Sequence, residues 1–66
     1  MLKNKIAQLR FERNMKQEDL ANLVGIRRET IARLEKGLYN PSLKIAMDIA
    51  KVFGKTVEEI FEFVDE

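Results

Sequence analysis

The chain contains no cysteine and no histidine among its 66 residues. Their absence removes disulfides, thiolate nucleophiles, imidazole bases and the usual zinc ligands together. No apolar run approaches the roughly 20 residues that span a bilayer, and no signal-peptide pattern opens the chain. We therefore expect a cytoplasmic protein that is not an enzyme and holds no metal and no cofactor.

The length of the chain limits it to one domain, residues 1–66, around one small core. The hydrophobic fraction of 45% and the absence of low-complexity segments indicate that this domain folds. Burial is marginal at this size, so we expect a second copy or very regular packing to contribute to stability.

The charges of the chain are divided between its two ends. Residues 1–44 hold ten Lys or Arg against five Asp or Glu, whereas residues 45–66 hold two against six, so the two segments carry +5 and −4 within a net charge of +1. A basic region attracts phosphates or anionic surfaces, and an acidic region elsewhere orients the molecule in the field of a polyanion. Solvated surface charge is the alternative interpretation.

Hydrophobic periodicity predicts a mainly α fold with five helices. Arg10 falls on the inward stripe of the first, where a core residue is expected. Lys16 is a poor N-cap for the second, and Gly25 ends it in the left-handed conformation. The stubs MLK and FEFV near the two ends alternate in polarity, so they either pair as a small antiparallel ladder or fray. The predicted helices cover residues 4–13, 17–24, 27–36, a segment with Asn40 as N-cap and Pro41 at its first helical position, and a short segment that opens with a capping box of Thr56 and Glu59.

Two of these helices, residues 17–24 and 27–36, are joined through Gly25. Ala21 is small enough to admit a close partner helix, and Ile31 and Leu34 form the apolar side of the second helix. Such a pair crosses at a steep angle, which is the geometry of a helix-turn-helix. The other side of the second helix carries Arg28, Glu29, Ala32, Arg33 and Lys36.

The run KQEDLANLVGIRRETIARLEKGLYNPSLKIAMDIAKVFGKTVEEIF resembles the Cro and phage-repressor type of helix-turn-helix regulator, the Xre family. The resemblance covers nearly the whole chain and implies a five-helix lambda-repressor-like fold, a homodimer, and double-stranded DNA bound by residues 27–36 in the major groove. The chain departs from the family at Lys16, where Ser or Thr is usual, and at Arg27, where a small polar residue is common. The matching elements are Gln17, Leu20-Ala21, Gly25, Ile31, Glu35, Gly37, Asn40-Pro41-Ser42 and Gly54.

The resemblance also implies roles for single residues. Base-reading positions of the family match Arg28, Glu29 and Arg33, which helical geometry also places on the outward side. Arginine donates two hydrogen bonds to guanine, glutamate accepts one from cytosine, and Ala32 fits a thymine methyl. For Glu29, an intrahelical pair with Arg33 is the alternative. Phosphate contacts are expected from Gln17, Arg27, Thr30, Lys36, Tyr39, Asn40 and Lys44.

Arg10 needs a partner, because an unpaired buried guanidinium is costly. The resemblance pairs it with Glu35, and we expect this pair to fix residues 27–36 in the orientation that meets DNA. One module reads too few base pairs for specific binding, so a homodimer on a palindromic operator is expected. For Phe61 and Phe63, a place in the monomer core is the alternative to the interface. The expected dimer interface comprises Leu2, Val57, Ile60, Phe61, Phe63 and Val64.

Other functions fit the sequence less well than a repressor. An antitoxin that binds a protein toxin and regulates its own operon would use the same domain, but no toxin-wrapping extension is evident. A protein-interaction adaptor would not need Gln17, Arg28 and Arg33. No effector-binding domain is evident either, so control by a small molecule is not expected.

Overall fold

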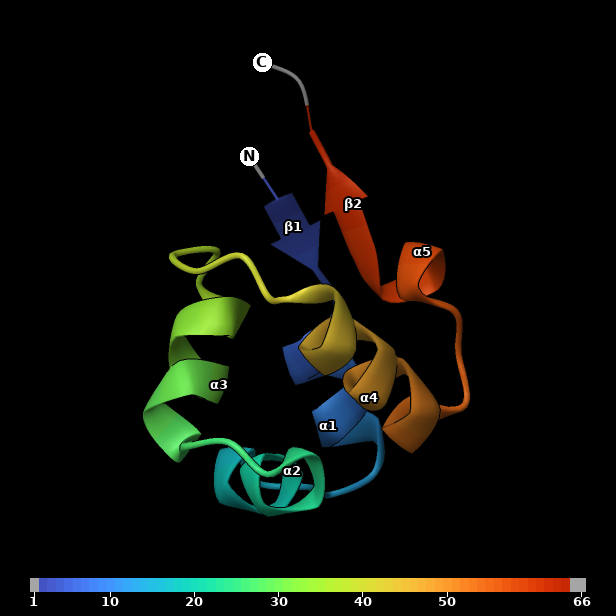
Figure 1. Ribbon diagram of the computed structural model, residues 1–66. Helices are drawn as coiled ribbons and strands as arrows, with labels where there is room; N and C mark the ends of the chain where they lie inside the picture. The colour runs from blue at the N-terminus through green and yellow to red at the C-terminus, as the bar shows by residue number, and fades with distance from the viewer. Residues whose placement is uncertain (1, 65–66) are drawn as a thin grey trace.

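The computed structural model describes residues 2–64 as a mainly helical domain with a small two-stranded sheet (Figure 1). This confirms the predicted fold class and the five predicted helices. In the described part of the chain, no helix is long and apolar enough to cross a membrane. The elements follow in the order β1 (Leu2–Asn4), α1 (Ile6–Glu12), α2 (Gln17–Val24), α3 (Arg28–Glu35), α4 (Leu43–Phe53), α5 (Val57–Ile60) and β2 (Phe61–Phe63).

The two strands pair as an antiparallel ladder, which confirms one of the two alternatives for the stubs. The register pairs Leu2 with Phe63, Lys3 with Glu62, and Asn4 with Phe61. The central pair places opposite charges across the ladder, which favours this register. Asn4 was predicted to open a helix, but it belongs to β1, and α1 begins at Ile6. Met1 of the stub MLK lies outside the described residues.

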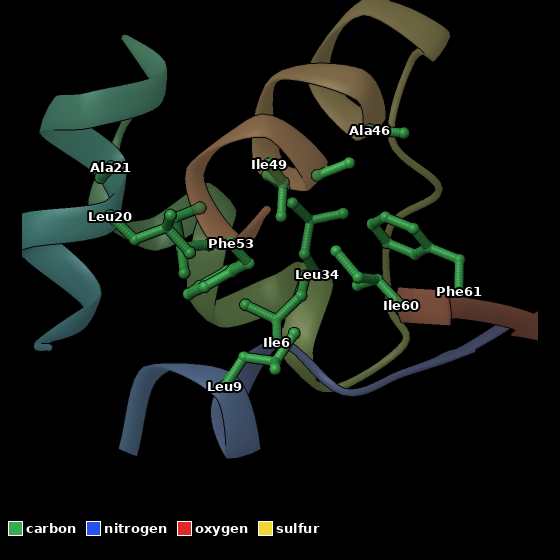
Figure 2. Close-up of a cluster of buried hydrophobic side chains, with 12 residues drawn as sticks. Ile6, Leu9, Leu20, Ala21, Leu34, Ala46, Ile49, Phe53, Ile60 and Phe61 are labelled. Atoms are coloured by element: carbon green, nitrogen blue, oxygen red, sulfur yellow. The ribbon is translucent and has the colours of Figure 1, made fainter. Parts of the chain in front are cut away.

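One hydrophobic core lies between the helices (Figure 2). All five helices and β2 contribute to it. The side chains of Ile60 and Phe61 point into this cluster from the end that carries the sheet. α5 has only four residues, and Ile60 is the one that it buries. Ile60 and the adjoining Phe61 therefore close that end of the core. The buried apolar residues are Ile6, Leu9, Leu20, Ala21, Ile31, Leu34, Ala46, Ile49, Ala50, Phe53, Ile60 and Phe61.

The turn between α2 and α3 is set by Gly25, as predicted. Gly25 has φ 80° and ψ 32°, in the left-handed region, and its N–H donates to the carbonyl oxygen of Ala21 at 2.8 Å. A Cβ built on Gly25 meets no atom within 4 Å, so the backbone angle rather than space requires glycine here. Ile26 then packs against the core, which fixes the start of α3.

Acidic side chains three residues after the N-cap support both α5 and α2. At α5, Thr56 Oγ1 accepts from the N–H of Glu59 at 3.2 Å and Glu59 Oε1 accepts from the N–H of Thr56 at 2.9 Å, which confirms the predicted capping box. The hydrogen bond from the Thr56 N–H is the main reason why the pKa of Glu59 lies below its ordinary value. At α2, the Lys16 side chain has no acceptor to offer. The Lys16 N–H donates to Asp19 Oδ2 at 2.9 Å and supplies the missing support.

The start of α4 differs from the prediction. Asn40 was expected as N-cap with Pro41 in the first turn, and this is wrong. Ser42 is the N-cap, and its Oγ accepts from the N–H of Ile45 at 3.2 Å. Serine caps a helix as well as asparagine does, and the fixed φ of proline suits the extended segment before a cap as well as a first turn.

Arg13, at the end of α1, connects that helix with the end of α4. Its Nη1 and Nη2 donate to the carbonyl oxygens of Val52 and Phe53 at 2.7 and 2.8 Å. Its Cζ also lies 5.1 Å from the centroid of the Phe53 ring. The last carbonyls of a helix lack intrahelical partners and carry partial negative charge, so the guanidinium both satisfies and neutralises them.

We expect Arg13→Ala to lower the free energy of unfolding by about 1–3 kcal/mol, because two hydrogen bonds and a cation–π contact are lost. Arg13→Lys keeps the charge but lacks the planar fork, so it should recover only part of this loss. Chemical denaturation followed by circular dichroism measures both variants. Equal stability of the wild type and Arg13→Ala would contradict this role.

Candidate nucleic-acid interface

α3 separates an apolar face from a charged one. Ile31 and Leu34 are buried in the core. Figure 1 shows α3 at the edge of the molecule, so side chains on its outer face can meet a large ligand. The residues expected to read bases lie on this face: Arg28, Glu29 and Arg33 are exposed, and Ala32 is half-buried. At about 100° per residue, these four positions lie on one side of α3, opposite Ile31 and Leu34.

Glu29 has a close basic neighbour on the same face. Its Oε1 lies 3.7 Å from Nη2 of Arg28, and the two side chains are 67% and 54% exposed. The partner considered from the sequence was Arg33, one turn further along, whereas the structure places Arg28 next to the carboxylate. An exposed pair at this distance contributes little to stability, so both side chains remain available to a ligand.

Most residues expected to contact phosphates lie at the ends of α3 and in the loop that follows it. Arg27 is the N-cap of α3 and Lys36 is its C-cap, and both are exposed. The Arg27 side chain makes no cap hydrogen bond. Asn40 is exposed in the loop before α4. An open hollow beside this loop is lined by Thr30, Arg33 and Tyr39.

Two further residues of that set have partners within the chain that the sequence analysis missed. Lys44 Nζ donates to Asp48 Oδ2 at 2.7 Å across one turn of α4, although its side chain is 82% exposed. Gln17 Nε2 donates to Glu35 Oε1 at 3.0 Å. The spacing of four residues was a signal for the first pair. No local pattern pointed to the second.

Arg10 and Glu35 form an ion pair between α1 and α3. Arg10 Nε donates to Glu35 Oε2 at 2.6 Å and Nη2 donates to Oε1 at 3.0 Å, with the side chains only 6% and 9% exposed. Arg10 Nη1 donates to the carbonyl oxygen of Met15 at 2.9 Å. The ring of Phe11, which lies off the apolar stripe, has its centroid 4.9 Å from Arg10 Cζ. These contacts compensate the burial of the guanidinium.

Asn4 holds the same end of α3 from β1, a link that the sequence analysis also missed. Its Nδ2 donates to the carbonyl oxygen of Leu34 at 2.7 Å, and its Oδ1 accepts from the N–H of Ile6 at 3.1 Å. One side chain thus supports the start of α1 and gives a second donor to a carbonyl in the last turn of α3, which also accepts from the N–H of Gly37 at 3.0 Å.

Two of the six residues expected at a dimer interface belong to the core instead. Ile60 is 2% exposed and Phe61 is 9% exposed, so neither presents a surface to a second copy. Placing them in the interface was wrong, because the single turn of α5 leaves them to close the core. The other four retain some exposure: Leu2, Val57 and Val64 are half-buried, and Phe63 is 77% exposed.

Two adjoining helices joined through Gly25, with the second one anchored inside and charged outside, define a helix-turn-helix domain. The chain belongs to the helix-turn-helix family, whose model matches residues 6–60. Within that family it is a transcriptional regulator of the Xre type.

Relatives occur in archaea and in bacteria. An uncharacterized HTH-type transcriptional regulator from Archaeoglobus fulgidus is 54% identical over 65 residues, which cover 98% of this chain and 92% of that protein. The cryptic phage CTXphi transcriptional repressor RstR from Vibrio cholerae is 37% identical over 60 residues, which cover 91% of this chain and 54% of RstR.

Solved structures share the fold. A putative DNA-binding protein from Bacteroides fragilis superposes with a TM-score of 0.81 at 22% identity, covering 94% of this chain and 100% of that one. The restriction-modification controller protein C.AhdI from Aeromonas hydrophila superposes with a TM-score of 0.76 at 29% identity, covering 83% of each chain.

We expect Glu35→Ala to lower the free energy of unfolding by about 3–5 kcal/mol, because it leaves the guanidinium of Arg10 buried without its counter-charge. Glu18→Ala, at an exposed position of α2, is the matched control and should change stability by only about 0.5 kcal/mol. Thermal and denaturant unfolding measure both. A melting temperature unchanged by Glu35→Ala would show that the pair does not hold the fold.

Proposed function

We propose that the protein binds double-stranded DNA sequence-specifically and regulates transcription with α3 in the major groove. The anchoring of α3 is the observation that carries this proposal. Asn4 and Arg10 hold its last turn through bonds of 2.7 and 2.6 Å to Leu34 and Glu35. The outer face of the helix is left free of packing. A helix that is bonded to the domain on its inner side and exposed on its outer side can enter the major groove, which is about 12 Å wide.

Direct base reading falls to the outer face of α3. Arg28 and Arg33 each have the planar donor pair that matches O6 and N7 of guanine, and Glu29 has an acceptor for N4 of cytosine. The methyl group of Ala32 fits beside a thymine methyl. Operator half-sites should therefore contain G·C pairs.

Phosphate contacts position this reading face. Arg27 and Lys36 stand at the two ends of α3, so one helix carries a cation on either side of its reading residues. Residues 1–44, which include α3, carry an excess of basic residues, and such an excess favours the approach of a polyanion. Further phosphate contacts are assigned to Gln17, Thr30, Tyr39, Asn40 and Lys44.

A homodimer on a palindromic operator, acting as a repressor, completes the proposal. Phe63 is exposed on β2 and lies opposite Leu2 of β1, so the two form an apolar end to the sheet. Val57 and Val64 are assigned to the same interface. The relation to the phage repressor RstR supports repression. A protein of this kind acts in the cytoplasm, on the nucleoid.

Two substitutions separate base reading from phosphate positioning. Arg28→Ala should relax the preference at one base position by about 1–3 kcal/mol. Lys36→Ala should weaken binding to all sequences alike and flatten the salt dependence by about one unit. Selection of bound sequences from a random DNA pool, followed by titrations at several salt concentrations, measures both effects. Identical behaviour of the two variants would refute this division of roles.

Dimerisation is tested at the sheet. Phe63→Glu should weaken self-association at least about tenfold, because a dimer would bury an unpaired charge. Leu23→Glu is the matched control, since Leu23 is an exposed apolar residue of α2, 63% exposed. Sedimentation at micromolar concentration measures both variants.

Half-sites should lie about 10 base pairs apart, centre to centre. A wild-type monomer with sequence-specific binding would exclude the dimer.

A further inference from the structure

One oxygen of Glu35 accepts hydrogen bonds from two other helices. Arg10 Nη2, from α1, and Gln17 Nε2, from α2, each donate to Oε1 at 3.0 Å. Glu35 is the last residue of α3, and Gln17 is the first residue of α2. A single carboxylate therefore joins three helices and restrains the side chain of Gln17.

The restraint leaves part of the Gln17 amide unused. A primary amide nitrogen carries two protons, and the amide oxygen accepts as well. One proton is directed at Glu35; within residues 2–64, the second proton and the oxygen have no partner. Gln17 as a whole is half-buried, so the residue is held by Glu35 and is not enclosed in the core. A phosphate oxygen is an acceptor suited to the second proton.

We propose that Glu35 is a positioning residue for Gln17 and aims its second amide proton at a phosphate of the DNA backbone. This inference rests on the proposed function, because the acceptor is a DNA phosphate. It gives the Arg10–Glu35 pair a second task besides holding α3: the pair sets the contact that α2 makes with the backbone.

The charge of Glu35 does not oppose this arrangement. A bare carboxylate close to a phosphate would repel it. Arg10 neutralises Glu35 with two hydrogen bonds, of 2.6 and 3.0 Å, so the carboxylate accepts from Gln17 without presenting a net negative charge. The same geometry without Arg10 would weaken DNA binding.

The neutrality of glutamine gives the contact a recognisable signature. A neutral donor displaces no condensed counterion, whereas a lysine or arginine does. Gln17→Ala should therefore weaken binding about three- to tenfold for every DNA sequence and leave the salt slope unchanged. Loss of a phosphate-bound cation would flatten that slope.

A double-mutant cycle tests the positioning by Glu35. Arg10→Met combined with Glu35→Leu removes the pair without leaving a buried charge, and circular dichroism checks that the fold persists. Gln17→Ala should cost about three- to tenfold in affinity in the wild type and less than about twofold in this background. Gln8→Ala is the control, because Gln8 is exposed and donates to Glu12 at 3.4 Å; it should have no effect in either background.

Amide NMR of the wild type provides a second test that does not depend on the stability of any variant. Gln8 and Gln17 are the only glutamines in the sequence, so their side-chain signals are easily assigned. A saturating operator duplex should shift the Gln17 proton that does not face Glu35 and leave the Gln8 pair in place.

The outcomes separate this inference from the proposed function. Equal losses on Gln17→Ala in the two backgrounds, or Gln17 signals unmoved by DNA, overturn the positioning role while DNA binding stands. A wild-type protein that binds no DNA overturns both. A loss confined to the wild-type background, together with the Gln17 shift, supports the positioning role.

Discussion

The buried pair of Arg10 and Glu35 is the interaction on which the placement of α3 depends. Apolar contacts alone leave a helix free to slide or turn, since the hydrophobic effect has no direction. The pair is directional. Its burial is tolerated because each partner makes a further hydrogen bond: Arg10 to the carbonyl oxygen of Met15, and Glu35 to Gln17. Among the described residues, no buried side-chain nitrogen or oxygen lacks a hydrogen-bond partner. The buried polar groups therefore favour one arrangement of the helices, and none of them contributes the free-energy penalty of an unsatisfied donor or acceptor.

The N-terminal segment supplies three such polar links. Asn4 reaches the last turn of α3, Arg10 reaches the end of the same helix, and Arg13 reaches the carbonyls that end α4. Each link reaches the last turn of a helix. The segment of β1, α1 and Arg13 thus forms a frame that holds the C-terminal ends of α3 and α4, and the hydrophobic core lies between the helices (Figures 1 and 2).

The sequence predicted the features that depend on neighbouring residues. The five helices, the turn at Gly25 and the capping box of Thr56 each involve a few consecutive positions, and all are present. Links across the chain were missed: Asn4 to Leu34 spans 30 positions and Gln17 to Glu35 spans 18, with no repeating pattern to reveal either. Ile60 and Phe61 were misplaced for a related reason. An apolar residue near a chain end suits a core or an interface equally, and only the packing around a one-turn helix decides between them.

The outer face of α3 takes no part in holding the domain together. Arg28, Glu29 and Arg33 are exposed, while the bonds that fix the helix arise from Asn4, Arg10 and Glu35 on its inner side and at its end. A change of a few codons on the outer face therefore leaves the frame intact. Duplicated copies of such a gene can diverge toward new targets while sharing one scaffold, and the same separation makes the domain a convenient starting point for redesign.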